Sequence, residues 1–537
     1  MEMNKHLIYA AAGQYPVETY QSVLLSFDME NLKIILQHDQ VVPMNEWQMV
    51  IHNTLLGAFK RKRGIFMKKR RNRFMALGLA AVLGLTAAGC QSTQESPKTD
   101  TTAATESKGQ EEQAATEDRQ EDKQAEETEQ SEKVLSIWLA TYISDEDKKK
   151  PQEEWPITQI CNEFEKENPG VKVEITLLPD QGAAHQSYKA AALAKSGPDI
   201  VNLWSGQPIF ALKDVVLDIS DMIPPEDKEN LMGWDVVTED FKEGGKILGY
   251  PAAGTEICGF IYNTDLIKKA GVDLEGNPPK TVDEFMAMLQ QIKDAGILPI
   301  IADSAGVNSL FTMNMATWWV QKTSNEDIAA ESKGEKKFSE DENFKNAFLK
   351  AQEMFDQGYV NEDYASSQDA LSRFLKGDAA MLGGVTSGIL QVVRESLGNE
   401  KVGFYILPDY DGTVIKSNTA IGGSGQVLAV ANYCPNPELA VKFCSFLSNK
   451  ENHLKLLKNY PMLPLRKDIT LKDLGWEGDS VMEKVYNIAQ NYSYWTDNSM
   501  VPDIANECFS LGTLAVTGKM TPDELAQKLD EKVQELQ

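Results

Sequence analysis

The fold follows from three short apolar stretches, VLSIWLA (134–140), VKVEITL (171–177) and DIVNLW (199–204), each of which is typical of a β-strand. Between them lie two segments, 156–168 and 188–195, whose apolar residues have helical spacing. Strands that alternate with helices pair in parallel, because each helix returns the chain to the same end of the sheet. The sequence therefore predicts an α/β fold.

The same alternation continues along the chain without a repeat of fixed period. Further strands are predicted over 257–262, 379–382, 402–407 and 426–431. Further helices are predicted over 263–270, 344–355, 368–375, 436–447, 452–457 and 521–536. Thr281 begins one more helix, because Thr281 and Glu284 have the spacing of a capping box, and Pro522 occupies a first helical position. The length of this module, 134–537, predicts two domains or lobes.

Upstream of the module lies a segment with the layout of an export signal. A basic stretch, MKKRRNRFM (67–75), is followed by small apolar residues, ALGLAAVLGLTAAG (76–89), and then by Cys90. The arrangement resembles a bacterial lipoprotein signal, although Ala87 stands where that signal usually has Leu. The resemblance implies that 67–89 is removed and that Cys90 carries a diacylglycerol as the new N-terminus. A transmembrane anchor is the alternative, and about 16 apolar residues is short for a bilayer span.

Two more segments flank this signal. Residues 1–66 have no repeating pattern, and we expect a mis-annotated upstream extension, with a genuine cytoplasmic extension as the alternative. Residues 91–133 contain 13 acidic and five basic side chains and no aromatic residue, Val, Ile or Leu. Such a stretch cannot bury enough apolar surface to offset its chain entropy. We expect 90–133 to be a lipidated cysteine followed by a disordered acidic tether, with an acidic protein-binding tail as the alternative.

Charge and cysteine content exclude several classes of protein. The formal net charge is −27, which argues against nucleic acids and anionic membrane surfaces as partners. After Cys90 the cysteines are odd in number and none forms a CxxC pair, so neither a disulfide scaffold nor a zinc ribbon is expected. They are Cys161, Cys258, Cys434, Cys444 and Cys508. We expect buried thiols, and a bridge between Cys434 and Cys444 stays open.

Several stretches of the module resemble a known family. They are 163–175, 196–206, 249–272, 278–285, 374–384, 436–447, 460–469 and 516–529. The most distinctive reads GYPAAGTEICGFIYNTDLIKKAGV (249–272) and is followed by PPKTVDEF (278–285). Their order and spacing, over nearly all of 134–537, resemble the extracellular solute-binding proteins of ABC importers, in the carbohydrate-binding group akin to maltose-binding protein.

The resemblance implies two hinged α/β lobes of the type II periplasmic-binding-protein class, with the ligand in the cleft between them. Three crossings between lobes are implied, near Pro251–Glu256, Pro408–Asp411 and Asn459–Pro461. The implied lobes are 134–252 with 410–458, and 253–409 with 459–537. Ligand contacts that exist only in the closed state shift the open–closed equilibrium by their differential affinity.

The implied function is capture of a mono- or oligosaccharide and its delivery to the permease of an ABC transporter. The protein would be a monomer, lipid-anchored through Cys90 to the outer face of a Gram-positive cell membrane. Two other functions stay open, namely the same fold binding a peptide, polyamine or anion, and a secreted polysaccharide hydrolase. The module has only His185 and His453, and it has no HExxH, GxSxG or Cys/His metal spacing. No catalytic residue, cofactor or metal is therefore expected.

Candidate ligand residues follow from what sugar binding needs, which is polar groups for the hydroxyls and aromatic rings for the C–H faces. Glu256 stands where the family places an acidic sugar ligand at the hinge. Trp204 ends the third strand, Tyr142 follows the first, and Asp180 and Gln181 follow the second. Ligands bind at this carboxyl edge of parallel strands. An ordinary exposed glutamate and a core tryptophan are the alternatives for Glu256 and Trp204.

The second lobe and the C-terminal region supply the other candidates. Trp318 and Trp319 lie where the family offers ring contacts, and we expect one of the pair to pack inward. Gly423 lies in a GGSG turn that would let backbone approach the sugar, with a plain loop as the alternative. Trp495 and Asp497 lie in a region that lines the cleft in relatives.

One departure from the family concerns the stretch that follows KGDAAM. Relatives carry a sugar-stacking aromatic residue there, whereas this chain has LGGVTSG (382–388) with no ring. Either the stacking comes from Trp318, Trp319 or Trp495, or the ligand is a different sugar.

Overall fold

The computed structural model describes residues 133–144, 146–304, 310–458, 460 and 462–537. The predictions for the upstream extension (1–66), the signal (67–89) and Cys90 with its acidic tether (90–133) lie outside the described residues, apart from Lys133, which begins the first strand. By its contacts, the chain from Gln130 to Gln537 forms one compact unit.

Within the described residues the strands form two sheets, and the first contains the three strands that open the module. In spatial order its strands are β2 (Val171–Leu177), β1 (Lys133–Leu139), β3 (Ile200–Trp204), β10 (Gln426–Val430) and β4 (Tyr250–Pro251). β1 pairs in parallel with both β2 and β3, as predicted for strands that alternate with helices. β10 runs antiparallel to β3 and β4. The carboxyl ends of β1, β2 and β3 therefore meet at one edge.

The helices of this half follow the predicted apolar spacing. They are α3 (Pro156–Glu167), α4 (Gln181–Leu193), α5 (Gln207–Phe210), α6 (Pro225–Asn230), α14 (Pro437–Leu447) and α15 (Lys450–Leu457). α3 buries Ile157, Ile160 and Phe164 on one face, which is the spacing that predicts it. α4 is longer than predicted, because it begins at Gln181 directly after β2.

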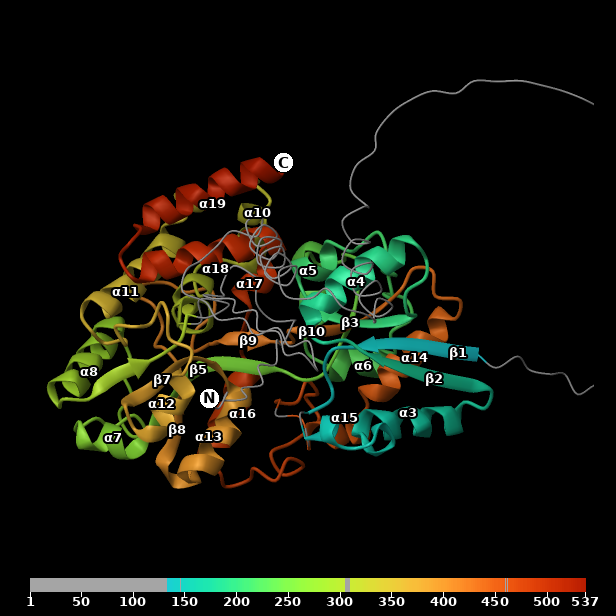
Figure 1. Cartoon of the computed structure of the whole chain (residues 1–537), viewed down its shortest axis with the longest axis horizontal. Helices are drawn as coiled ribbons and strands as arrows, with labels where there is room; N and C mark the ends of the chain where they lie inside the picture. The colour runs from blue at the N-terminus through green and yellow to red at the C-terminus, as the bar shows by residue number, and fades with distance from the viewer. Residues whose placement is uncertain (1–132, 145, 305–309, 459, 461) are drawn as a thin grey trace, which may run out of the picture. The chain divides into compact units, whose positions relative to one another are not determined.

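The second sheet is built from later parts of the chain. Its strands in spatial order are β11 (Ser493–Tyr494), β9 (Ile421–Gly423), β5 (Glu256–Asn263), β7 (Ala379–Thr386) and β6 (Leu298–Ile301), with β8 (Val402–Tyr405) also paired to β5. β5 runs antiparallel to β7, β8 and β9, and β6 pairs in parallel with β7. Figure 1 shows the two sheets as separate groups of strands, with β1, β2, β3 and β10 in one and β5, β7, β8 and β9 in the other.

A larger set of helices surrounds the second sheet. They are α7 (Thr264–Lys269), α8 (Val282–Asp294), α9 (Thr317–Val320), α10 (Asn325–Ser332), α11 (Glu342–Asp356), α12 (Ala370–Lys376), α13 (Leu390–Leu397), α16 (Ser480–Ala489), α17 (Thr496–Ser499), α18 (Pro502–Val516) and α19 (Pro522–Leu536). α11, α18 and α19 pack against one another (Figure 1). Thr281 caps α8 as predicted, but Glu284 accepts from the Lys280 N–H instead of closing the capping box.

Each sheet has its own apolar core. Leu135 and Ile137 pack with Phe164 on one face of the first sheet, and a separate cluster of buried apolar residues covers the other face. A larger core around the second sheet contains Phe260 and Phe285. Burial of apolar surface contributes about 25 cal/mol per Å², so two cores stabilise two separately packed halves. This confirms the two-lobe α/β architecture, and the halves are called the first and second lobes below.

The chain crosses between the lobes at positions that differ in part from the predicted ones. It leaves the first sheet after Pro251 and enters the second at Glu256. It returns at Ser424–Gly425, between β9 and β10. The sequence analysis places this return near Pro408–Asp411, which is wrong, because β9 pairs with β5 and β11 of the second lobe. The sequence analysis assigns 410–458 to the first lobe, but this segment belongs to it only from Ser424 onward.

The segment after α15 stays with the first lobe longer than expected. Met462 and Leu465 pack in the first-lobe core, and the Arg466 guanidinium lies 3.5 Å from the Asp227 carboxylate of the same lobe. The entry into the second lobe therefore follows Arg466, and the boundary near 459–461 is corrected accordingly.

Candidate functional site

The Ser205 hydroxyl joins the two lobes at the carboxyl end of β3. Its Oγ donates to the Ser424 carbonyl oxygen at 2.6 Å and lies 2.6 Å from the Tyr494 hydroxyl, which therefore donates to it. The Ser205 N–H donates to the Gly425 carbonyl oxygen at 3.1 Å. Because Ser205 is fully buried, these bonds fix the first-lobe sheet to the crossing and to β11 of the second lobe.

Two glycines let the backbones approach this closely. Gly206 has a φ of +71°, and a Cβ there would lie 2.3 Å from the Asn498 carbonyl oxygen. Gly423 has a φ of +108°, and a Cβ there would lie 2.4 Å from the Tyr492 ring. Both positions require glycine, because the backbone is left-handed and the space is filled. The sequence analysis expects Gly423 to face a sugar, and this is corrected, because Tyr492 occupies that space.

Trp204 presents an exposed aromatic ring beside Ser205. The contacts of Ser205 with Ser424, Gly425 and Tyr494 are called the joint below. Its side chain is 40% exposed, so the alternative of a core tryptophan is excluded. The ring stacks on the His185 imidazole of α4, with centroids 5.2 Å apart, and His185 Nε2 accepts the Trp204 N–H at 2.8 Å. Burial lowers the pKa of His185 to about 4, which keeps Nε2 unprotonated and able to accept. The indole is therefore held in place by His185 while Trp204 stays 40% exposed.

Glu256 begins β5 directly after the first crossing. Its Oε1 accepts a hydrogen bond from Thr386 Oγ1 at 2.6 Å, and its backbone pairs with Gly423. Burial raises the pKa of this carboxyl, while the hydrogen bond from Thr386 acts in the opposite direction. Thr386 ends β7 within the stretch 382–388 that lacks the family's ring. The Thr386 hydroxyl is therefore the side-chain partner of the Glu256 carboxyl.

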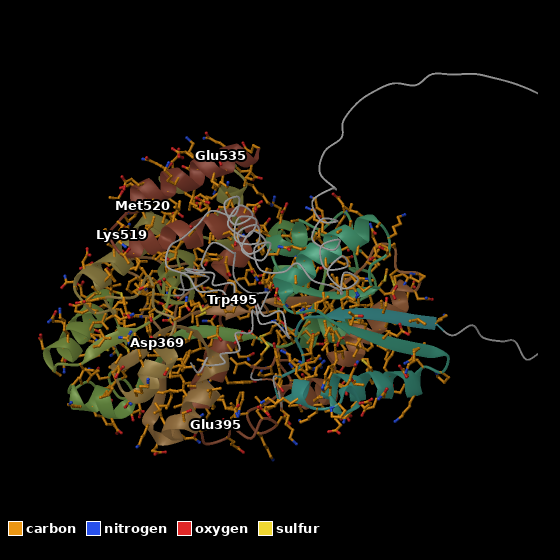
Figure 2. All side chains as sticks on the ribbon, viewed as in Figure 1. Asp369, Glu395, Trp495, Lys519, Met520 and Glu535 are labelled. Carbon is orange, nitrogen blue, oxygen red and sulfur yellow. The ribbon has the colours of Figure 1, made fainter. Side chains whose placement is uncertain are left out.

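Trp495 and Asp497 approach the same region from the C-terminal part of the chain. Trp495 is 9% exposed, and its Nε1 donates to the Gly423 carbonyl oxygen at 3.3 Å. In Figure 2 it lies in the interior, whereas Glu395 and Glu535 stand at the periphery. The Oδ1 atom of Asp497 is buried and has no hydrogen-bond partner among the described residues. Burial raises the pKa of the Asp497 carboxyl.

Cys258 lies on β5, two residues after Glu256. Burial raises the pKa of its thiol well above the usual value, and the nearby charges of Glu256 and Asp497 raise it further. Both carboxyls therefore act electrostatically on this thiol of β5.

Asp180 and Gln181 serve the first lobe at the edge where β2 ends. Asp180 caps α4 by accepting the Ala183 N–H at 2.8 Å. Gln181 is buried, its Nε2 lies 3.4 Å from Asn202 Oδ1, and its Oε1 has no hydrogen-bond partner in the described chain. Asn202, on β3, also accepts from Thr141 Oγ1 at 2.6 Å. Asp180 therefore serves as the N-cap of α4, and Gln181 forms a buried amide pair with Asn202.

Tyr142 does not offer its ring to the cleft. Its side chain is 3% exposed, its φ is +73°, and its hydroxyl accepts the Ala253 N–H at 2.7 Å. Ala253 lies in the first crossing, so Tyr142 positions the hinge segment. The prediction of Tyr142 as a ligand contact is corrected to this structural role.

Trp318 and Trp319 are both buried in the second-lobe core. Trp318 Nε1 donates to the Pro408 carbonyl oxygen at 2.9 Å, and Trp319 Nε1 donates to Asp341 Oδ2 at 2.7 Å. Each indole is 1% exposed or less. The expectation that one of the pair faces the ligand is therefore wrong, because both N–H groups and both rings are engaged within the protein.

The residues that gather at the joint are thus Trp204, Glu256, Trp495 and Asp497, together with some that the sequence analysis missed. The missed residues are His185, Ser205, Thr386 and Tyr494. Thr386 lies in a stretch that the sequence analysis singled out, but only for its missing ring. The others carry no motif, since their roles depend on contacts between distant segments.

A cavity of about 460 Å³ lies between the lobes and is distinct from this group. Its lining includes Lys228, Trp234, Asp235, Lys416, Tyr492 and Tyr494. Neither Trp204, Glu256 nor Asp497 lines it, and the link to the joint runs through Tyr494, whose hydroxyl meets Ser205.

Two negative findings apply to the part of the chain that the structure describes. No group of three or more His, Cys, Asp or Glu side chains is placed to hold a metal ion there. Nor does any helix there combine the length and the apolar character needed to cross a membrane. The five cysteines that follow Cys90 are free thiols, so Cys434 and Cys444 are not bridged in this structure.

The relatives in sequence are named as binding proteins. An uncharacterized ABC transporter extracellular-binding protein of Pyrococcus horikoshii is 31% identical over 163 residues, which cover 28% of this chain and about a third (34%) of that relative. The multiple sugar-binding protein of Streptococcus mutans is 21% identical over 343 residues, which cover 60% of this chain and 78% of that protein.

Solved structures share the fold at low identity. A chitin oligosaccharide binding protein superposes with a TM-score of 0.60 at 20% identity, covering 75% of this chain and 98% of that one. A cyclo/maltodextrin-binding protein complexed with maltotetraose gives 0.58 at 18% identity, covering 75% and 97%.

A family model extends these likenesses over more than half of the sequence. Residues 150–453 match the model for the bacterial extracellular solute-binding protein. The matched range runs from before α3 into α15, and so spans most of the first lobe and the sheet strands β5 to β9 of the second. The chain belongs to the bacterial extracellular solute-binding protein family.

Proposed function

We propose that this protein captures a mono- or oligosaccharide between its lobes and delivers it to the permease of an ABC importer. The observation that carries the proposal is the ring of Trp204, 40% exposed at the carboxyl end of β3. An exposed indole held by a stacked imidazole offers an apolar face for the C–H side of a sugar ring. The sugar-binding functions named for the Streptococcus mutans relative and for the structural neighbours support this choice of ligand.

The contacts of the joint suggest how binding favours closure. Trp204 belongs to the first lobe, whereas Glu256 and Asp497 belong to the second. A sugar that stacks on the ring and bonds to the carboxylates makes its full set of contacts only when both lobes approach. Binding then shifts the open–closed equilibrium by the free energy of those added contacts.

In this proposal the ligand is released unchanged. The relatives found are binding proteins, and the two carboxyls are used here as hydrogen-bond acceptors. We further propose that the protein works outside the cell, as the family description implies, and that a lipid on Cys90 holds it at the membrane. Two acyl chains anchor a protein stably, at about 0.8 kcal/mol per buried methylene.

Calorimetric titration of purified 134–537 with a panel of mono- and oligosaccharides tests the proposal. We expect one class of saccharide to bind, and a ligand at 100 times its Kd to raise the free energy of unfolding by about 2.7 kcal/mol. Chromatography of the ligand after incubation should recover it intact. Failure of every saccharide to bind, or the appearance of hydrolysis products, would contradict the proposal.

A further inference from the structure

The cavity of about 460 Å³ between the lobes takes no part in the proposed function. Its volume lies within the range of about 300–1,000 Å³ that is usual for small-molecule sites. The first lobe contributes Lys228, Trp234 and Asp235 to its lining, and the second lobe contributes Lys416 and Tyr492. A molecule bound in this cavity would therefore touch both lobes.

The lining of the cavity is basic, although the protein is acidic overall. It contains the ammonium groups of Lys228, Lys416 and Lys467 and a single carboxylate, that of Asp235. Three positive charges and one negative charge give the lining a formal charge of +2, whereas the whole chain carries −27. Because an acidic protein repels anions over most of its surface, a local excess of ammonium groups decides where an anion can bind.

The two lysines next to α6 are held by backbone contacts that leave their charges in place. Lys228 lies on α6, and its Nζ donates to the Ser220 carbonyl oxygen at 2.9 Å. The Lys467 N–H donates to the carbonyl oxygen of Asn230, the last residue of α6, and its Nζ donates to that of Glu229 at 3.1 Å. Neither lysine is in an ion pair within the described residues. Each ammonium has three N–H donors, so donors remain for a ligand.

The second lobe supplies a third ammonium group and an unpaired hydroxyl. Lys416 Nζ donates to the Tyr492 carbonyl oxygen and lies 5.5 Å from the centre of the Tyr492 ring. Lys416 and Asp235 interact electrostatically, but they form no ion pair in the part of the chain that the structure describes. Tyr492 is 9% exposed, and its hydroxyl forms no hydrogen bond with a described residue. A phenol this deeply buried ordinarily has a hydrogen-bond partner, and a ligand in the cavity would supply one.

The apolar part of the lining suits a sugar ring better than an inorganic anion. The Trp234 indole is fixed, because its Nε1 donates to the Asp227 carbonyl oxygen at 3.2 Å and its ring meets that of Tyr250 with centroids 5.1 Å apart. Val320 and Ile415 add aliphatic surface. A sugar has a C–H face that packs against such groups, and an inorganic phosphate has none.

We propose that this cavity is a second binding site, for an acidic monosaccharide whose carboxylate or phosphate group binds Lys228, Lys416 and Lys467. Lysine binds such oxyanions as a point charge and needs no fork geometry. The cavity is separate from the site proposed at Trp204, so this inference goes beyond the proposed function and does not rest on it. Because two of the three lysines are exposed, the affinity falls as the salt concentration rises.

Calorimetry of purified 134–537 with matched sugars tests the inference. The probes are glucuronate, galacturonate and glucose 6-phosphate, and their counterparts are glucose, galactose and inorganic phosphate. At pH 7 and low salt we expect an acidic sugar to bind at least tenfold more tightly than its neutral counterpart, and glucose 6-phosphate or a uronate to bind more tightly than inorganic phosphate. Comparison of the uronates with the sugar phosphate shows which oxyanion the lysines prefer.

Substitutions locate the binding in the cavity. A double variant, Lys228→Gln with Lys467→Gln, changes two exposed side chains and should weaken the acidic sugar at least tenfold. Tyr492→Phe should weaken it about threefold and leave the melting temperature unchanged, because the hydroxyl has no protein partner to lose. Lys246→Gln removes an exposed lysine that does not line the cavity, and as the matched control it should keep the parent affinity.

The outcomes separate this inference from the proposed function. Acidic sugars that bind no more tightly than neutral ones, inorganic phosphate that binds as tightly as every acidic sugar, or an affinity that survives the double variant would overturn the inference. Loss of acidic-sugar binding in Trp204→Ala would overturn it as well, because Trp204 does not line the cavity, and would leave the proposed function in place. If Trp204→Ala bound the acidic sugar as the parent does, and the parent bound no other saccharide, the inference would stand and Trp204 would lose its proposed role.

Discussion

The Trp204 indole stacks on the His185 imidazole at an interplanar angle of 24°, and His185 Nε2 also accepts the backbone N–H of Trp204. One histidine thus fixes both the ring and the peptide of the exposed tryptophan. Because His185 lies on α4 and Trp204 ends β3, the pair also fastens the helix to the carboxyl edge of the sheet.

Replacing the exposed ring should weaken binding without unfolding the protein. Trp204→Ala is expected to lower saccharide affinity at least tenfold, because the sugar loses its stacking surface. The melting temperature should fall by only a few degrees, since the ring is 40% exposed. Trp476→Ala, at a partly buried tryptophan packed against the second core, serves as the control and should keep affinity unchanged. Equal affinity of Trp204→Ala and the parent in calorimetry would contradict the assignment.

Acid should destabilise the protein partly through His185. Its pKa is about 4 in the folded protein and near 6.5 when unfolded, so the unfolded chain binds more protons between these values. The stability it contributes is present above about pH 6.5 and is lost as the pH falls to about 4. His185→Gln keeps an acceptor for the Trp204 N–H and removes the proton site.

This substitution should therefore reduce the loss of unfolding free energy between pH 6.5 and 4 by roughly 1–3 kcal/mol. Urea unfolding at several pH values measures the difference. His453→Gln provides a comparison, because burial also lowers the pKa of His453 to about 4. Each variant should remove only the part of the acid-induced loss of unfolding free energy that its own histidine causes. If the unfolding free energy of His185→Gln depended on pH between 6.5 and 4 as that of the parent does, the His185 imidazole would not be held neutral in the folded protein.

Because Gly206 lies close to Asn498, replacing Gly206 by alanine should lower the free energy of unfolding strongly. Gly206 and Gly475 share a φ of +71°, but a Cβ at Gly475 meets no atom within 4 Å. Gly475→Ala should therefore lower the unfolding free energy by about 1 kcal/mol, the cost of the left-handed backbone alone. Gly206→Ala adds a clash with the Asn498 carbonyl and should lower it by about 2–4 kcal/mol. Equal losses in urea unfolding would mean that the lobes are not in contact there in solution.

Replacing the buried carboxyl of Glu331 by a neutral group should stabilise the protein. Glu331 is buried on α10 with Oε2 unpaired within the described residues, and burial together with the Asp341 charge raises its pKa to about 9. The unfolded chain releases this proton near pH 4.5, so the group favours unfolding increasingly as pH rises from 4.5 to 9.

Glu331→Gln should thus raise the unfolding free energy at pH 8 by roughly 1–3 kcal/mol and have little effect at pH 4.5. Thermal unfolding at both pH values checks this. Glu335→Gln, at an exposed position nearby, is the control and should change little at either pH. A loss of stability at pH 8 would show that Glu331 is ionised and paired in the folded protein.

Local pattern was sufficient for the three strands that open the first lobe. The stretches at 134–140, 171–177 and 199–204 became β1, β2 and β3, and only β3, a continuous apolar run, is buried on both faces. The crossing at Ser424–Gly425 could not be found this way. β9 is only three residues, IGG, and pairs through backbone groups that any sequence possesses.

The tryptophans illustrate the same limit at the site. Trp204, Trp318 and Trp319 are equally apolar in sequence, yet the first is exposed and the other two are buried. Which face of a short element meets a core depends on the packing of distant segments, and a single sequence without relatives does not contain that information. Glu256 was predicted as a ligand residue from its place in the family motif, but its hydrogen-bond partner Thr386 is 130 residues away in the sequence.

The sequence alone determined the α/β class and the acidic character of the protein, because these depend on short-range periodicity and on composition, and the family resemblance added the two-lobe architecture. Only the tertiary structure decided which tryptophan is exposed, where the chain crosses between lobes, and that Glu256 pairs with Thr386. The physical reason is that exposure and electrostatic environment are set by contacts between residues far apart in the chain, and these exist only once both cores have formed.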